Sequence, residues 1–324
     1  MITRANIILT FLSALYVITT FSFSCLVLNI GKPGILNTQT VNSDTLQFTL
    51  SRNKTVLPVS AGTSRPLKLI LDTGMPIDGI LIYNPDLIDS IKLINPIEVT
   101  IPGAGKDKPS TGLMSDSMSF YAGDVEFKNK KIVVLTNDIY KGFPTDGVIG
   151  YSVFGYFTTE INYDDFTIVL HNPDNFKADS TWEAVPIEFK ENNIPWINVS
   201  VAVGNEEPVL MSVYIDYASS EAVEMLISPR MKYKLPEQTT DYYLGRGLSG
   251  DIYGKKGKIA KVIIGKYELN NISGAFAPAE VRSKQKDADG IIGNDFLRRF
   301  NVIFDYANKM LYIKPNKHFN DPFE

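Results

Sequence analysis

The chain has 324 residues, of which 44% are hydrophobic and 21% charged, with a formal net charge of −4. This is ordinary globular composition, and the slight acidity argues against a nucleic-acid partner. The single cysteine excludes a disulfide within the chain, and two histidines give little basis for a metal site or a Ser-His-Asp enzyme. We therefore expect no metal and no cofactor, and any catalysis must use carboxylates.

The N-terminus has the pattern of an export signal. Arg4 precedes residues 5–31, which carry no charge. Residues 1–24 are interpreted as a signal peptide, and they resemble a loose bacterial lipoprotein signal in which Cys25 is the lipidation candidate. A cleaved secretory signal and an uncleaved anchor helix remain alternatives, because the uncharged run is long enough to span a bilayer. Residues 25–44 are expected to be a linker.

All three interpretations of the N-terminus place the rest of the chain outside the cytoplasm. We expect a protein of the periplasm or cell surface, most simply a membrane-anchored lipoprotein and otherwise a secreted protein. The membrane is then a partner through the N-terminus only.

The remainder of the chain contains an internal repeat. Asp146-Gly147-Val148-Ile149-Gly150 recurs as Asp289-Gly290-Ile291-Ile292-Gly293, and upstream Leu69–Gly74 parallels Val213–Ala218. Asp72 precedes Gly150 by 78 residues, and Asp216 precedes Gly293 by 77. Chance matches would not keep this register. Asp146 and Asp289 are interpreted as turn-capping residues, and Gly150 and Gly293 as structural.

Each aspartate follows a pattern of two strands. Short apolar runs end at Leu71 and Ile215, and each is preceded by another strand-like run and a turn. Short helices are expected at Ser152–Phe157 and Asp295–Phe300. The pattern predicts a mostly β protein with two similar lobes. Their bounds are 45–172 and 185–316, with a polar linker at 173–184 and a tail at 317–324.

These residues resemble the aspartic peptidases of the pepsin and retropepsin type. The resemblance rests on the hydrophobic-hydrophobic-Asp-Thr-Gly motif, the later hydrophobic-hydrophobic-Gly segment and the duplication. It covers both lobes and is closest to bacterial, exported members. It implies the two-lobed acid-protease fold with an active-site cleft between the lobes. It also implies a catalytic pair, Asp72 and Asp216, that shares one proton.

The two motifs differ. Asp72-Thr73-Gly74 is intact, whereas Asp216-Tyr217-Ala218-Ser219 keeps only the aspartate and a family-like Ser219. In the family the Thr hydroxyl bonds across the lobes, and Tyr217 is too large to make the same short bond. Ala218 would resist a positive φ. Gly150 and Gly293 are expected to pack beneath the two Asp loops.

The family also has flaps that close over the substrate. Candidate flaps contain Gly103 and Gly105 in the first lobe, and Gly245 and Gly247 in the second. An extended peptide bound there would pair with strand edges.

Two functions remain open at this stage. The first is an exported aspartic endopeptidase that acts on peptides or proteins, most simply as a monomer. The altered second motif favours the alternative, a catalytically impaired module that binds extended peptides or a protein partner. Pairing of two intact first lobes from separate chains is disfavoured, because each chain carries its own second lobe.

Overall fold

The structure is a computed structural model that describes residues 43–190, 192–282, 285 and 287–323. Strands dominate it, which confirms the expected mostly β class. The signal peptide, Cys25 and nearly all of the 25–44 linker lie outside the described residues. Within the described part of the chain, no helix is long and apolar enough to cross a membrane.

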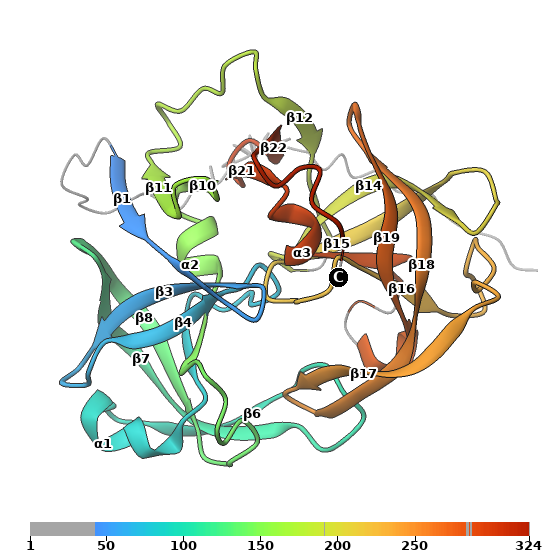
Figure 1. The fold of residues 1–324 in the computed structure, drawn as a ribbon. Coiled ribbons are helices and arrows are strands. Elements are labelled where there is room, and N and C mark those ends of the chain that lie inside the picture. The colour runs from blue at the N-terminus through green and yellow to red at the C-terminus, as the bar shows by residue number, and fades with distance from the viewer. Residues whose placement is uncertain (1–42, 191, 283–284, 286, 324) are drawn as a thin grey trace, which may run out of the picture. The chain divides into compact units, whose positions relative to one another are not determined.

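The first lobe is an eight-stranded sheet that closes on itself (Figure 1). Its strands in spatial order are β2 (Thr49–Ser51), β3 (Lys54–Ala61), β4 (Leu67–Leu71), β9 (Gly147–Ile149), β5 (Gly79–Ile82), β8 (Val125–Leu135), β7 (Ser110–Ala122) and β6 (Ile97–Ile101). A further pairing of β3 with β7 closes the sheet. The 3-10 helix η1 (Pro85–Leu87) and helix α1 (Ile88–Ile91) connect β5 to β6.

The second lobe repeats this topology strand by strand. Its order is β13 (Glu188–Phe189), β14 (Pro195–Val203), β15 (Val209–Asp216), β20 (Gly290–Gly293), β16 (Val223–Ile227), β19 (Tyr267–Pro278), β18 (Gly250–Ile264) and β17 (Thr239–Gly247). A pairing of β14 with β18 closes the sheet, and the 3-10 helix η2 (Ala279–Arg282) follows β19. The sequence repeat therefore corresponds to a structural duplication.

The repeated motifs lie side by side in each lobe. Strand β4 pairs in parallel with β9, and β15 pairs in parallel with β20, so each aspartate adjoins the later glycine segment. The sequence predicted a turn-capping role for Asp146 and Asp289, but in the structure their carboxylates bond the neighbouring strand. Their carboxylates accept the main-chain N–H of Lys68 and Ser212, each at 2.8 Å, and so tie β9 to β4 and β20 to β15.

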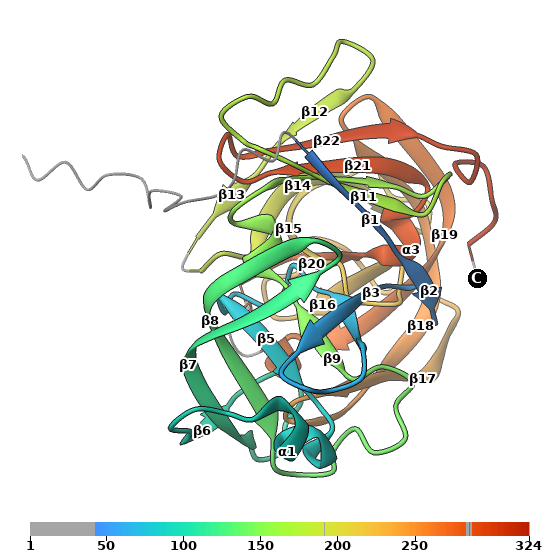
Figure 2. The ribbon, with the colours of Figure 1, turned by 90° about the vertical axis from the view of Figure 1, so that its left-hand side faces the viewer.

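A six-stranded sheet joins the two lobes (Figure 2). Its order is β1 (Ser43–Gln47), β11 (Thr167–His171), β10 (Thr158–Asn162), β21 (Phe300–Asp305), β22 (Met310–Pro315) and β12 (Glu183–Pro186). Strands β10 and β21 pair antiparallel at the join, with Ile161 opposite Val302. Both residues belong to one buried apolar cluster that runs through both lobes. The shared core holds the two Asp-bearing sheets together by apolar burial.

The two short helices that follow the glycine segments are shorter than expected. Helix α2 is Tyr151–Phe154, and α3 is Asn294–Leu297. Each lasts about one turn because the chain soon enters β10 or β21 in the joining sheet. The helices therefore act as corners between the glycine segment and that sheet.

Candidate active site

Asp72 and Asp216 occupy equivalent turns, one in each lobe. Asp72 directly follows β4, and Asp216 ends β15. In both turns the main-chain N–H two residues further on donates to a carboxylate oxygen. Gly74 N lies 2.7 Å from Asp72 Oδ1, and Ala218 N lies 3.1 Å from Asp216 Oδ1. Each carboxylate is therefore oriented by its own turn in the same way.

The two carboxylates are close neighbours. A methyl group on Gly74 would lie 3.0 Å from Asp72 Oδ1 and 3.7 Å from Asp216 Oδ1. Burial, and then the charge of Asp216, raise the pKa of Asp72 from 3.8 to about 7. Two adjacent carboxyl groups ionise together only at high cost, which is why the charge of Asp216 raises the pKa of Asp72.

Alanine and serine fit the second turn without conflict. Neither Gly74 nor Ala218 has a positive φ, so the strain expected at Ala218 does not arise. Ser219 N donates to Asp216 O at 3.0 Å and closes the turn. The main-chain geometry that supports the aspartate is thus retained in the altered motif.

Gly150 and Gly293 lie against the two Asp turns. A Cβ on Gly150 would collide with the main-chain oxygens of Asp72 and Met75. A Cβ on Gly293 would collide with the main-chain oxygen of Glu221. Only glycine permits an approach this close between two backbones.

Thr73 makes one half of a bridge between the lobes. Its side chain is 2% exposed, and its hydroxyl donates to Ile215 O at 2.8 Å. The Thr73 hydroxyl oxygen also accepts the main-chain N–H of Tyr217 at 2.9 Å. Thr73 therefore bonds both neighbours of Asp216, Ile215 and Tyr217.

Tyr217 replaces the other half of the bridge with a longer connection. Its side chain is fully buried, and its hydroxyl bonds the hydroxyl of Tyr163, which follows β10 in the joining sheet. Tyr163 in turn donates to Asn294 Oδ1 at the start of α3. The expectation that Tyr217 cannot make the Thr-type bond agrees with this geometry, but the link between the lobes survives through Tyr163.

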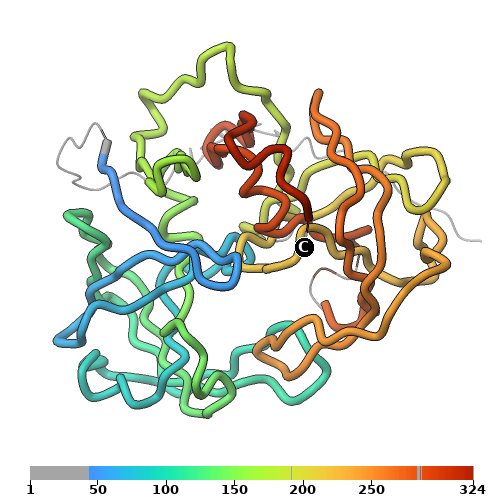
Figure 3. The backbone as a smooth tube through the Cα atoms, viewed as in Figure 1, coloured from blue at the N-terminus to red at the C-terminus, as the bar shows by residue number. Residues whose placement is uncertain are grey.

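The two candidate flaps meet each other (Figures 1 and 3). The loop between β6 and β7 forms hydrogen bonds with the turn between β17 and β18. Ser249 N donates to Ala104 O at 2.9 Å, and Asp107 N donates to Ser249 O at 2.7 Å. Ser110 Oγ adds a bond to Leu248 O at 2.7 Å. The hairpin tips of the two lobes are thus joined by main-chain pairing.

The flap glycines differ in their surroundings. A Cβ at Gly103 would meet Leu248, at Gly105 it would collide with Ser249 O, and at Gly247 it would collide with Ala104 O. Gly245 has a φ of +137°, and a Cβ there would meet nothing within 4 Å. At this position glycine is favoured by the backbone conformation and not by a close approach to the other hairpin. Three of the four sequence-predicted glycines therefore lie in the contact between the hairpins.

Aromatic side chains line the first lobe beside the dyad. The rings of Tyr83 and Tyr140 stack with centroids 4.3 Å apart, and Phe143 packs edge-on to both. Burial, and to a smaller degree Asp72 and Asp216, raise the pKa values of both tyrosines. Tyr140 also donates to Arg246 O in the second flap at 3.1 Å. The surroundings of the carboxylates are therefore largely apolar.

The architecture has a counterpart among solved structures. The crystal structure of the aspartic proteinase from Irpex lacteus matches with a TM-score of 0.55 at 12% identity, over 86% of this chain and 99% of that one. The fold is that of the two-lobed, pepsin-like aspartic proteinases. No protein-family model matches the sequence, and no curated protein matches it. The similarity to this aspartic proteinase is therefore a similarity of fold.

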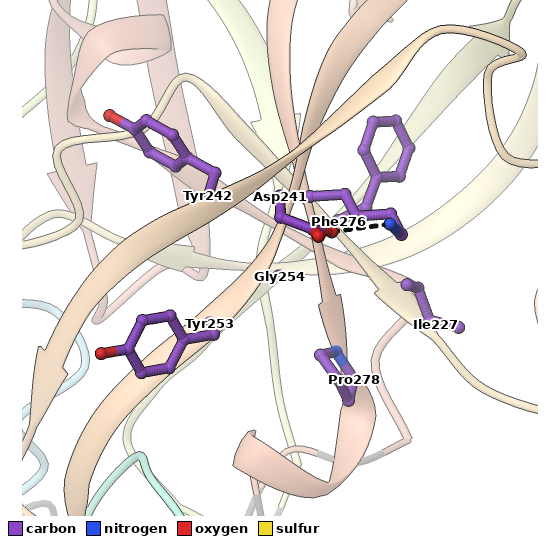
Figure 4. Close-up of a pocket in the computed structure, with 8 residues that line it drawn as sticks. Ile227, Asp241, Tyr242, Tyr253, Gly254, Phe276 and Pro278 are labelled. Atoms are coloured by element: carbon purple, nitrogen blue, oxygen red, sulfur yellow. Dashed lines mark hydrogen bonds and ion pairs between the residues drawn. The ribbon is translucent and has the colours of Figure 1, made fainter.

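A separate depression lies on the second lobe of this pepsin-like fold, between β17, β18 and β19 (Figure 4). Its volume is about 430 Å³, and the ion pair between Asp241 and Lys255 lies within it. Tyr242 and Tyr253 line it, and neither Asp72 nor Asp216 does. The hollow is thus distinct from the dyad.

Three residues at the site escaped the sequence analysis. Lys54 donates to Ala218 O, and Tyr163 and Asn294 complete the Tyr217 network. Lys54 and Tyr163 lie 164 and 54 residues from their partners. Long-range side-chain contacts leave no local pattern, so only Asn294, which directly follows the repeated glycine segment, could have been suspected.

The tyrosine network predicts unequal effects of two matched substitutions. Tyr217→Phe removes one hydrogen bond and leaves Tyr163 paired with Asn294, so we expect a loss of about 0.5–1.5 kcal/mol in unfolding free energy. Tyr163→Phe leaves both Tyr217 and Asn294 without that buried partner, and we expect about 1–3 kcal/mol. Urea unfolding of the two variants measures the difference. Equal losses would contradict the assigned order of the network.

Proposed function

We propose that the chain is an aspartic endopeptidase. The observation that carries this is the placement of Asp72 and Asp216 on equivalent turns, with both carboxylates beside Gly74 and the pKa of Asp72 raised by burial and by Asp216. In the reaction, the ionised aspartate takes a proton from a water, whose oxygen attacks the scissile carbonyl carbon. The protonated aspartate donates to the carbonyl oxygen. The resulting diol collapses when the first aspartate gives the water proton to the nitrogen and the C–N bond breaks. The second aspartate takes back a proton from a diol hydroxyl as the new carboxyl group forms, so the pair again holds one proton.

The substrate class we propose is an extended peptide segment held between the dyad and the two hairpins. Main-chain pairing with strand edges would supply affinity. The apolar wall around Tyr83 and Tyr140 would exclude water from the reacting bond. The hydrogen bonds between the hairpins, such as Ser249 N to Ala104 O, must break for the substrate to enter. The hairpins then act as a pair of flaps.

The proposal includes export. The support is the sequence pattern of residues 1–31 and the position of Cys25 within it. We propose a lipoprotein anchored through Cys25, with the peptidase lobes outside the cytoplasm and acting as a monomer. Metabolic labelling with a fatty acid tests this, since Cys25→Ser should abolish the label.

The dyad predicts a definite pH dependence. Activity requires one proton on the pair, and the raised pKa of Asp72 keeps that proton bound up to about pH 7. We expect kcat/KM to fall as pH rises through about 7, where both carboxylates ionise. The folded state also binds more protons than the unfolded chain between pH 3.8 and about 7, so stability falls as pH rises through that window. Rate profiles and urea titrations over the same range measure the two effects.

Proteolysis by the pure protein tests the proposed activity. An unfolded protein substrate is incubated from acid to neutral pH, and the new termini are identified by mass spectrometry. Internal cleavage that declines toward neutral pH is the expected result. A folded protein that cleaves nothing at any pH would support the alternative, a binding module on the same fold.

A further inference from the structure

The turn between β2 and β3 is fixed beside the site by its hydrogen bonds to the second lobe. Arg52 and Asn53 have φ values of 49° and 57°, in the left-handed region that residues with side chains rarely adopt. Their carbonyl oxygens accept from the second lobe, Arg52 O from Ser220 Oγ at 2.8 Å and Asn53 O from Asn294 Nδ2 at 2.7 Å. A strained turn held by two bonds from the other lobe has a fixed position beside the Asp216 turn.

This turn places the ammonium group of Lys54 next to the dyad. The partly buried Lys54 Nζ donates to Ala218 O, two residues after Asp216. No carboxylate lies within ion-pair distance of Lys54 among the described residues. An ammonium has three donors, and here the only bond found for it within the described chain is to a neutral carbonyl. A partly buried cation in this state is a strong attractor for an anion.

Arg52 adds a second cation on the same turn. Its guanidinium carbon lies 5.7 Å from the centroid of the Phe143 ring, on the aromatic wall beside Asp72. Arg52 is exposed and forms no ion pair within the described part of the chain. Lys54 and Arg52 therefore face the region of the dyad from one turn, and both have donors to spare.

The nearby negative charges do not balance these two cations. Burial lowers the pKa of Lys54, while the charges of Asp216, Asp72 and Glu221 act in the opposite direction and favour its ammonium form. Glu221 is paired with Lys256 at 3.1 Å, and the dyad with its shared proton carries one negative charge. One positive charge is left over at the β2–β3 turn. A substrate carboxylate would neutralise it at the moment of binding.

We propose that Arg52 and Lys54 form a subsite that binds the side-chain carboxylate of an Asp or Glu residue in the peptide substrate, near the scissile bond. This rests on the proposed peptidase function. The ammonium of Lys54 lies at the Ala218 carbonyl, an edge that an extended substrate would follow, and Arg52 lies over the Phe143 ring. Lys54 turns from Ala218 O toward the incoming carboxylate and thereby frees that carbonyl for the substrate main chain. The subsite thus determines specificity.

The test compares matched peptides that differ only by Glu or Gln at single positions around one cleavage site. At one position we expect kcat/KM to favour Glu by about 10- to 100-fold, the range for a hydrogen bond to a charged partner. Lys54→Met and Arg52→Met should each reduce this ratio severalfold, and Lys54→Arg should retain most of it. Lys258→Met, at an exposed lysine with no ion pair found in the described residues, is the control that leaves the ratio unchanged.

Binding to the Asp72→Asn protein separates this inference from the proposed activity. Calorimetry measures the affinities of this variant for the Glu and Gln peptides, and so detects the subsite without catalysis. A Glu preference in binding that Lys54→Met removes supports the subsite even if the native protein cleaves nothing. Cleavage with equal rates for Glu and Gln peptides, or a Glu preference that survives Lys54→Met in a folded protein, overturns the subsite and leaves the peptidase intact. Failure of both peptides to bind also overturns it.

Discussion

Asp72→Asn and Asp216→Asn should each lower kcat for peptide hydrolysis by about 10²–10⁴-fold, the usual contribution of a positioned general acid or base. Asn has nearly the shape of Asp, so the bonds from Gly74 N and Ala218 N to the side chain remain available. KM should change little, because the substitution removes proton transfer and leaves the surrounding surface in place. Initial rates with a fluorogenic peptide measure both constants.

Asp86→Asn is the matched control for these two variants. Asp86 is exposed in η1 and belongs to neither motif, and the same change there should leave kcat unaltered. Full activity in Asp216→Asn would mean that the second aspartate is vestigial. The reaction would then have to depend on Asp72 alone.

The second large effect concerns stability. Arg299→Met should lower the unfolding free energy by about 3–5 kcal/mol, because it breaks a buried ion pair and leaves the main-chain oxygens of Asp295 and Pro322 without their charged donor. The Arg299 side chain is 0% exposed and bonds Asp295 Oδ1 at 3.1 Å and Pro322 O at 2.8 Å. Asp295 would retain only its ion pair with Arg298, whose Nε lies 2.7 Å from Asp295 Oδ1. Urea unfolding at neutral pH measures the change.

Arg230→Met supplies the comparison for Arg299→Met. Arg230 also pairs with an aspartate, Asp287, but the two side chains are 70% and 65% exposed. An exposed pair of this kind contributes about 0–1 kcal/mol. Similar losses in the two variants would show that the Arg299 pair adds no more than a surface bridge. Asp295 belongs to α3, which follows Gly293, so Arg299→Met should also disturb the Asp216 turn.

Main-chain requirements explain what the sequence alone could predict. Gly150 and Gly293 must be glycine because another backbone lies against them, and each repeats at a fixed distance from its aspartate. Short apolar runs mark strands such as β4 and β15, in which several consecutive side chains are buried. Such constraints are local in sequence, so they leave a readable pattern. The fold class followed from them.

Side-chain contacts between the lobes could not be predicted in this way. Tyr217 looked like the loss of a bridge, because its partner Tyr163 lies 54 residues away, in a turn of the joining sheet. Lys54 belongs to no motif of the sequence, and only the folded chain brings its ammonium to Ala218. Both depend on how two distant segments pack. The chemical character of the site therefore required the structure, although its aspartates did not.

A double-substitution cycle at the two aspartates tests the central claim most directly. The rate of peptide cleavage is measured for the native protein, Asp72→Asn, Asp216→Asn and the combined variant, all at one acid pH. Because residues that act as a unit are strongly non-additive, we predict that the combined variant is no slower than either single one. Losses that multiply in the combined variant would contradict a dyad that shares one proton, as would a native protein that cleaves no faster than Asp72→Asn.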